Sequence, residues 1–572
     1  MLPQGAGPDE HAHTQAANFI YEHNRLPVYQ QDKDALYYSI FGATRSFRPP
    51  LVYISSAFTH KLLDKTGVDF TFPYRKANAI IGALSALLMF LTLYAYTQKT
   101  ALAVSVTLIF MLMPQTGFVY SYLNEDGAAI MSCILILLSV CLLLKNGVTA
   151  VTLVLFGFAC GILSLTKLTA WGFCLPICIF AVFFILRSDA RWFRTFCIVF
   201  TSFAVTAGWR IAFNMLHHGL ENPFNWSLEA GFQNLHARID LDTVVNYKVL
   251  GMSYLDLLFN GDNFLVKTFY SLVGHLDWLR LPLGPLQYAA YGAVLLAGAL
   301  GCVLVIFKPV LRRESNRSQY WFEISVILGC LLLFFLYMHF NINNDIQTQG
   351  RYLLPAFPGF LLISVTAWFA LYAERSAGRS TPRFTGMGYA VLVVAFVYVH
   401  AQAMYKYVIP FYYRGAYLET ADALFTPVSL QNQEEIQTHD LSLQSQKRGV
   451  LEYLVTGPDP GLYFENVDMN VTPDYLLLKI SFWNSRTDYY SVYWDAGQGM
   501  SEGTAVQGYA SLGDNIVYQL LPVSAIENLR FDLGSPETQF RLTGLAYGKF
   551  KFKPVFSVLN RLFNYSIYDA SH

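Results

Sequence analysis

Long apolar stretches dominate the first 407 residues of the chain and then stop. A helix needs about 20 consecutive apolar residues to cross a hydrocarbon core of about 30 Å, and ten stretches approach this length. We place these spans near 77–97, 101–120, 126–145, 149–167, 168–187, 194–213, 286–307, 321–341, 352–373 and 386–407. The pattern predicts a polytopic α-helical membrane protein.

Two polar regions accompany the spans. Residues 1–76 precede the first span, and residues 214–285 separate the sixth from the seventh. Residues 14–24 and about 50–63 have the spacing of amphipathic helices that lie in a membrane interface. The 214–285 region mixes aromatic and charged residues, which favours further interfacial helices over another full span.

From about residue 410 the apolar positions alternate with a period of two. Such segments, separated by Gly, Asn, Asp and Pro, are typical of β-strands. They are Tyr475–Phe482, Tyr489–Trp494, Ile516–Leu521, Leu529–Leu533 and Phe540–Leu545. The spacing predicts a β-sandwich of about 100 residues within a C-terminal domain at 410–572, closed by an amphipathic segment at Phe556–Tyr568.

Positive charge predicts the sidedness, because short cytoplasmic loops are enriched in Lys and Arg. Three basic loops fall on one side by parity alone. Their charged residues are Arg187, Arg191 and Arg194, then Lys308, Arg312, Arg313 and Arg317, then Arg375, Arg379 and Arg383. With that side cytoplasmic, residues 1–76, the loop near Asn124, residues 214–285, the loop ending at Arg351 and the C-terminal domain are expected to face outward.

An outward position for residues 1–76 requires a segment that carries them across the membrane. We therefore expect a further transmembrane helix before Met1, so that the complete protein would have about eleven spans. An in-frame apolar segment upstream of Met1 would test this expectation.

Composition and charge limit the classes of function that the chain can have. The chain has 54% hydrophobic and 14% charged residues, and its net charge of zero argues against a nucleic-acid partner. All eight cysteines lie in apolar runs and are interpreted as packing residues. The ionisable residues Lys167, Arg210, Glu323 and Arg351 lie near span ends, which favours a site on the outer face over an ion-coupled translocation pathway.

Asp9 and Glu10 open the first outer region. A carboxylate there could accept the proton of an attacking sugar hydroxyl, and Asp9 could equally serve as the N-cap of the following helix. His11 and His13 do not have metal-site spacing, because residues i and i+2 do not share a helix face.

Four further residues are candidates on the same face. Asn124 and Asp126 stand at the outer start of a span and are either caps or contributors to a cleft. Lys167 and Arg351 lie near outer span ends, where they either bind a phosphate or extend to the interface for structural reasons.

These residues fall within six short motifs that together resemble the GT-C superfamily of membrane glycosyltransferases, and most of all an uncharacterised bacterial branch of it. The motifs are PDEHAH, RPPLVY, LNEDGAA, SLTKLTAW, GHLDW and QGRYLLPAFP, and the resemblance covers about residues 1–407. It implies a polyprenyl-phosphate sugar donor, a glycan or glycolipid acceptor, and a place in the bacterial plasma membrane with the active site on the extracytoplasmic side.

The resemblance also implies roles for single residues. Asp9 would be the catalytic base, with Glu10 as neighbour or substitute, and Arg351 with Lys167 would bind the donor phosphate. The remaining substrate-binding residues would be His13, Asn124, Asp126, His275, Asp277 and Tyr352. A bound Mg²⁺ or Mn²⁺ could replace the cations in stabilising the leaving phosphate.

The C-terminal domain is similar around Leu529–Gly534 to outward β-sandwiches attached to some bacterial glycosyltransferases. Trp483, Tyr490, Tyr493 and Trp494 would either hold an acceptor glycan or belong to the core. The chain as a whole is interpreted as an inverting glycosyltransferase. The alternatives are a surface polysaccharide polymerase or lipid-linked sugar flippase, and a non-catalytic scaffold that binds glycans.

Overall fold

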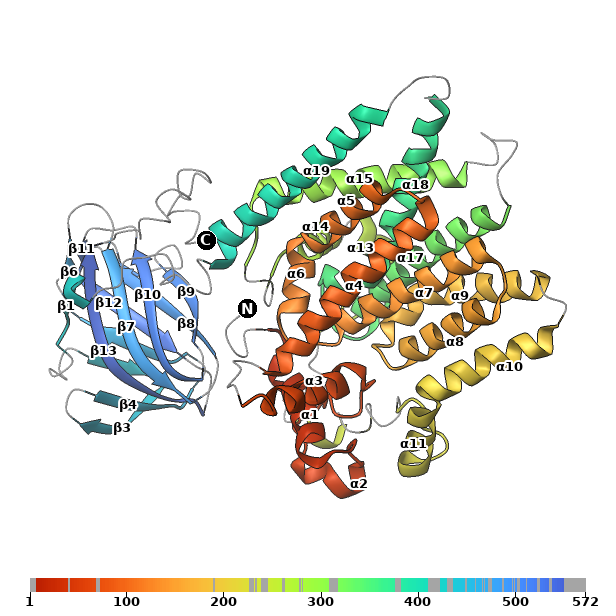
Figure 1. Cartoon of the computed structure of the whole chain (residues 1–572). Coiled ribbons are helices and arrows are strands. Elements are labelled where there is room, and N and C mark those ends of the chain that lie inside the picture. Colours follow the sequence, from red (N-terminus) through yellow and green to blue (C-terminus); the bar gives the residue numbers. More distant parts are fainter. Residues whose placement is uncertain are drawn as a thin grey trace. The chain divides into compact units, whose positions relative to one another are not determined.

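A computed structural model of the chain shows a helical unit and a β unit (Figure 1). It describes residues 7–39, 42–67, 73–188, 191–225, 231, 234–237, 245–259, 263–276, 279, 281–307, 317–375, 382–409, 422–429 and 436–549, the last range with short gaps. The helical unit comprises Asp9–His400, and the β unit contains the strands that follow. Each unit is described by itself.

The helical unit begins with two helices outside the long apolar series. These are α1 (Glu10–His23) and α3 (Leu51–Asp64), which contact each other. Both lie where amphipathic helices were predicted, although α1 begins four residues before residue 14. Between them lie the short α2 (Tyr29–Asp32) and η1 (Lys33–Ala35).

Helices cover all ten predicted spans. They are α4 (Pro73–Thr97), α5 (Thr100–Met111), α6 (Pro114–Ser121), α7 (Asp126–Asn146), α8 (Ala150–Ser164), α9 (Thr169–Ser188), α10 (Trp192–Phe203), α11 (Trp209–His218), α15 (Pro285–Ile306), α17 (Arg317–Asn343), α18 (Phe357–Arg375) and α19 (Pro382–Ala403). Within the described residues, seven helices are long and apolar enough to cross a membrane, or eight if a bent pair forms one span.

The difference from ten has local causes. Three predicted spans are outside the seven: α8 has only 15 residues, the described apolar helix Gly350–Val365 is also shorter than a span, and α5 and α6 meet at an angle of 67°. The bend falls at Pro114, which lacks a backbone N–H and begins α6. The Leu112 carbonyl at the break is hydrogen-bonded by Nδ1 of His400 at 2.8 Å. The bend directs the chain after α6 into the loop that holds Tyr122 to Glu125.

Helix α7 is the centre of the helical unit. It contacts α4, α8 and α9, and most of its side chains are buried. Its apolar residues point in all directions, as expected for a helix surrounded by others. Small residues permit close packing nearby, since a Cβ at Gly329 of α17 would lie 2.2 Å from the Phe173 carbonyl oxygen of α9. This dense centre supports the start of α7, where charged residues gather.

Shorter elements occupy the region between α11 and α15. The described ones are α13 (Tyr254–Phe259) and α14 (Phe264–Val273), and η4 (Gly350–Ala356) precedes α18. No helix long enough to span lies in the described parts of 214–285, in agreement with the prediction of short helices there.

The β unit is built from two antiparallel sheets and a small two-stranded pair. One sheet has the order β10-β7-β13-β4-β3 with β1 on β13, and the other has the order β2-β5-β12-β8-β9. The strands are β1 (Phe425–Pro427), β2 (Ile436–His439), β3 (Leu441–Lys447), β4 (Val450–Val455), β5 (Gly461–Phe464), β6 (Met469–Asn470), β7 (Leu476–Asn484), β8 (Asp488–Asp495), β9 (Ala505–Ala510), β10 (Gly513–Leu521), β11 (Ala525–Ile526), β12 (Asn528–Leu533) and β13 (Gln539–Lys549).

All five predicted strands are confirmed, as β7, β8, β10, β12 and β13. Their alternating residues face a common core that includes Phe482, Phe531 and Phe540. The strands that the pattern missed are mostly shorter or rich in polar residues, such as β2 and β3. The predicted closing segment Phe556–Tyr568 lies outside the described residues.

Candidate functional site

Asp9 and Glu10 have different environments although they are adjacent. Asp9 adopts a left-handed backbone conformation with φ 57° at the start of α1. Its carboxylate accepts a hydrogen bond from Nη2 of Arg45 at 2.9 Å, and 36% of the side chain is exposed. The carboxylate makes no capping bond to α1, so the interpretation of Asp9 as a side-chain cap is wrong. An ion pair with Arg45 takes its place.

Glu10 points into the helical unit. It is buried and forms an ion pair with Arg75 of α4, in which Nη2 of Arg75 donates to Oε2 at 2.5 Å. The backbone N–H of Leu123 also donates to Oε1 at 3.4 Å. These contacts join α1, α4 and the loop before α7, which gives Glu10 a structural position.

His13 is the first residue in a series of buried polar contacts. Its Nδ1 lies 2.8 Å from the Tyr53 hydroxyl, and that hydroxyl donates to Glu125 at 2.6 Å. Because the single Tyr53 proton is used toward Glu125, the proton in the first contact belongs to His13 Nδ1. Glu125 in turn lies 3.4 Å from Nη1 of Arg48.

A second series of charged contacts lies at the start of α7. Nζ of Lys167 donates to Asp126 at 2.7 Å, and Nε of Arg351 lies 3.8 Å from the other carboxylate oxygen. Nη1 of Arg351 donates to the Tyr122 hydroxyl at 2.8 Å. Lys167 and Arg351 also lie 4.5 Å and 5.4 Å from the centre of the Tyr352 ring. The two predicted phosphate-binding cations therefore share Asp126 and Tyr352.

The Asp9–Arg45 pair and these two series of contacts form one cluster, since Arg48 and Arg351 also act electrostatically on Asp9. Among the described residues its four cations are Arg45, Arg48, Lys167 and Arg351, and its three carboxylates are Asp9, Glu125 and Asp126. Four positive charges and three negative charges leave one positive charge. Such an excess among partly buried groups favours an anionic ligand.

The charges act on one another's ionisation. Burial disfavours the charged form of Asp9, but Arg45 and more distant cations outweigh it and hold the pKa of its carboxyl below the usual value. Burial together with Arg45 holds the pKa of His13 well below its usual value. At neutral pH Asp9 is therefore ionised and His13 is uncharged.

Asn124 serves as a cap. Its side-chain oxygen accepts from the backbone N–H groups of Asp126 at 2.8 Å and Gly127 at 3.3 Å, and its amide donates to the Tyr122 carbonyl at 3.0 Å. These bonds satisfy free donors at the start of α7. The capping alternative considered for Asn124 is confirmed.

Of the remaining predicted substrate-binding residues, one belongs to the cluster, one does not, and one lies outside the described residues. Tyr352 belongs to the cluster, and its hydroxyl donates to Gln347 at 2.6 Å. His275 is half-buried after α14, where its backbone N–H donates to the Tyr270 carbonyl at 2.9 Å, and within the described part of the chain no hydrogen bond joins it to the cluster. Asp277 lies outside the described residues.

The aromatic candidates of the β unit divide between core and surface. Tyr490 and Trp494 are buried in the core, which decides against their exposure to a glycan. Trp483 and Tyr493 occupy the outward positions of β7 and β8. An arginine accompanies each, since Arg541 lies 5.5 Å from the Trp483 ring and Arg530 lies 5.3 Å from the Tyr493 ring.

Sequence reasoning missed several members of the site. Arg45, Tyr53 and Arg75 contact Asp9, His13 and Glu10 across separations of 36, 40 and 65 residues. Arg48 and Tyr53 lie in the RPPLVY motif. That motif was the available signal for both residues.

The carboxylates of the cluster are candidate metal ligands. In the described ranges, no group of three His, Cys, Asp or Glu side chains is arranged to hold a metal ion. Asp9, Glu125 and Asp126 are each paired with a cation instead. Among the described residues, these paired carboxylates therefore do not fit Mg²⁺ or Mn²⁺.

The fold and the cluster define a multi-pass membrane protein with a charged site formed by α1, α3, the start of α7 and the segment before α18. A family model described as "Predicted membrane protein (DUF2142)" matches residues 3–360. The chain belongs to this family. No curated protein matches the chain.

Several solved structures are similar in shape. ArnT from Cupriavidus metallidurans bound to undecaprenyl phosphate is 12% identical with a TM-score of 0.40, over 69% of this chain and 66% of ArnT. The oligosaccharyltransferase AglB from Archaeoglobus fulgidus is 12% identical with a TM-score of 0.37, over 69% of this chain and 52% of AglB.

A third structure corresponds to a shorter part of the chain. The C-terminal CBM6 of LamC from Zobellia galactanivorans is 11% identical with a TM-score of 0.18, over 22% of this chain and 99% of that module. At these values the likenesses describe shape and carry no inference about chemistry.

Proposed function

We propose that the protein is a glycosyltransferase that moves a sugar from a polyprenyl-phosphate donor to a cell-envelope glycan or lipid-linked acceptor on the extracytoplasmic face of the bacterial plasma membrane. The observation that carries the proposal is the cluster in which an ionised, partly exposed Asp9 pairs with Arg45 and is acted on by Arg48 and Arg351. The sequence motifs that resemble GT-C enzymes contain Asp9, Arg48, Lys167 and Arg351, and so contribute a base and cations to the same cluster.

In the proposed reaction an acceptor hydroxyl attacks the anomeric carbon of the donor. The new bond forms between that carbon and the acceptor oxygen, and the bond to the phosphate oxygen breaks, so the configuration inverts in one step. Asp9 takes the hydroxyl proton, and the lipid phosphate leaves with the electron pair. Lys167 and Arg351 stabilise the negative charge that develops on the phosphate.

The contacts of each residue suit these roles. Arg45 keeps Asp9 ionised and orients its carboxylate. Arg351 presents a buried guanidinium whose Nε has no hydrogen-bond partner among the described residues, and a phosphate oxygen could accept that proton. The buried Glu10 is already used by Arg75, so Asp9 is the better candidate for the base.

The test uses the full chain in lipid nanodiscs with a panel of polyprenyl-phosphate sugars and mass analysis of the released lipid phosphate. Loss of general base catalysis in Asp9→Asn should lower turnover by about 10²- to 10⁴-fold. The matched control is Asp34→Asn, which changes an exposed carboxylate of the same region and should leave turnover unchanged.

Two results would count against the proposal. Undiminished turnover in Asp9→Asn would remove Asp9 from the reaction. Absence of turnover by the wild type with every donor would favour the polymerase or flippase alternatives.

A further inference from the structure

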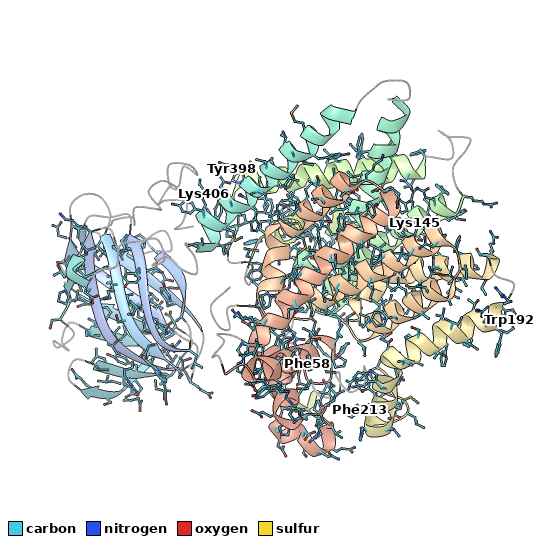
Figure 2. The ribbon with its side chains drawn as sticks, viewed as in Figure 1. Phe58, Lys145, Trp192, Phe213, Tyr398 and Lys406 are labelled. Carbon is cyan, nitrogen blue, oxygen red and sulfur yellow. The ribbon has the colours of Figure 1, made fainter. Side chains whose placement is uncertain are left out.

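Arg210 is a buried cation in a helix that otherwise has little protein around it. Helix α10, the π-helical turn η2 (Ala204–Gly208) and α11 form one apolar stretch from Trp192 to His218. This stretch lies at the periphery of the bundle (Figure 1), and Trp192 at its far end is labelled in Figure 2. Arg210 is only 6% exposed, whereas its neighbour Trp209 is 43% exposed. The sequence placed Arg210 near the end of the span 194–213, and in the structure Arg210 is the second residue of α11.

The π-helical turn positions the arginine. A π turn adds one residue to a helical turn and so shifts the face that later residues present. Ala207 within the turn is buried, and so are Arg210 and Asn214 after it, at the i, i+3 and i+7 spacing of one helix face. The turn is packed tightly, because a Cβ at Gly161 of α8 would lie 2.5 Å from Thr206.

Arg210 has neutral partners. Its Nη2 donates to the Phe47 carbonyl at 3.2 Å, and its guanidinium carbon lies 5.5 Å from the ring centre of Phe213, which Figure 2 labels. With its oxygen turned toward Arg210, the Asn225 amide accepts from the same Nη2 at 3.1 Å. Within the described residues no carboxylate forms an ion pair with Arg210. A buried charge without a counter-charge is costly, so an anion from outside the chain would stabilise it.

Arg210 also lines a pocket that is open on one side. The cavity itself has a volume of about 30 Å³, and the space reaches about 400 Å³ only when the open solvent at its mouth is included. Its polar lining is Arg210, Asn214 and Ser164, and its apolar lining includes Leu165, Leu168 and Phe224. Leu168 and Phe224 are exposed at the surface. One cation at the head of an apolar pocket matches a ligand with an anionic head and a hydrocarbon chain.

We propose that this pocket binds the phosphate group of an anionic membrane lipid, with Arg210 as the phosphate ligand and the lipid chain along the apolar surface. A guanidinium binds phosphate with two parallel hydrogen bonds. Arg210 is not part of the Lys167 and Arg351 cluster, so this lipid is additional to the sugar donor. The proposal does not depend on the proposed transferase activity.

The experiment compares the full chain in nanodiscs of phosphatidylcholine alone with nanodiscs that also contain phosphatidylglycerol. The wild type should show a higher Tm with phosphatidylglycerol, because a ligand that binds only the folded state stabilises it. Native mass spectrometry should show one retained phosphatidylglycerol. Arg210→Gln should lose both effects, while Arg194→Gln, which changes an exposed arginine of α10, should keep them.

A second variant tests the same proposal if Arg210→Gln fails to fold. Asn214→Asp places a carboxylate four residues from Arg210 in the same pocket, so the protein keeps a paired arginine and should lose the bound lipid. A further comparison adds inorganic phosphate to the protein in phosphatidylcholine nanodiscs and measures Tm, to distinguish free phosphate from a lipid phosphate. A rise in Tm with free phosphate alone, or an unchanged preference for phosphatidylglycerol in Arg210→Gln, would overturn the proposal.

Discussion

At the scale of single residues, the adjacent carboxylates of Asp9 and Glu10 have different roles. Glu10 is structural, and Asp9 is the candidate catalytic base. Asp9 occupies a left-handed conformation, which Asp adopts more readily than most side chains. Glu10 is the first residue of α1, and its carboxylate is directed into the helical unit toward Arg75. Asp9 stays near the surface with Arg45. The two carboxylates should therefore respond differently to neutralisation.

Glu10→Gln should destabilise the protein. The substitution leaves the buried Arg75 guanidinium without its counter-charge, and breaking a buried pair in this way costs about 3–5 kcal/mol. Thermal unfolding in detergent measures the effect, with Glu22→Gln on the exposed side of α1 as the control. An equal Tm for the wild type and Glu10→Gln would contradict the structural role.

His13 should make stability depend on pH. Its folded pKa lies well below the usual value of about 6.5, so below that pH the unfolded state binds more protons than the folded state. The His13 contribution is complete above about pH 6.5 and is lost as the pH falls toward the folded pKa.

The measurement is Tm as a function of pH for the wild type and His13→Gln. The variant should lose less stability on acidification than the wild type. His23→Gln, an exposed change on the same helix, should follow the wild type. Parallel curves for the wild type and His13→Gln would show that His13 titrates normally.

At the scale of elements, the site depends on how closely helices approach beneath it. Helix α7 carries Asp126 at its first position, with Asn124 as its cap, and it packs on α9. Helix α9 in turn contacts α17, where Gly329 lies against the Phe173 carbonyl. A side chain at this position would separate two central helices.

Gly329→Ala should therefore destabilise the helical unit. A Cβ there would lie 2.2 Å from a backbone oxygen, so α9 and α17 must move apart. Overpacking of this kind costs about 1–3 kcal/mol, which a fall in Tm would report. Gly388→Ala in α19 has open space around its Cβ and should be neutral or slightly stabilising. Equal Tm values for both variants would show that the helices adjust without cost.

At the scale of the whole molecule, the chain contains two units with separate hydrophobic cores. The core of the helical unit gathers around α7, and the core of the β unit lies between its two sheets. Each core is contributed by residues of its own unit. This separation predicts that the β unit can fold by itself.

A fragment from residue 422 to residue 549 should unfold in one cooperative transition, with a free energy of unfolding in the usual range of about 5–15 kcal/mol. Phe531→Ala, which empties a core position, should cost about 3–5 kcal/mol. Ile516→Ala should cost far less, because that side chain is 58% exposed. A gradual transition measured by circular dichroism would indicate that the β unit requires the rest of the chain.

The sequence by itself determined the elements, because each depends on local periodicity. A run of about 20 apolar residues or an alternation of period two can be read within one segment, and these patterns located the helices of the helical unit and five strands of the β unit. Local patterns could not show that α5 and α6 are bent, or that α8 is too short to count as a full span.

Only the tertiary structure decided which residues meet. Asp9 with Arg45, Glu10 with Arg75, and Arg210 with Phe47 come together across 36, 65 and 163 residues. No periodicity connects such distant positions, since packing of the intervening helices brings them together. For the same reason, the sequence suggested that Asp9, Lys167 and Arg351 were important. The fold decided that Glu10 is structural and that, in the part of the chain that the structure describes, no carboxylate pairs with Arg210.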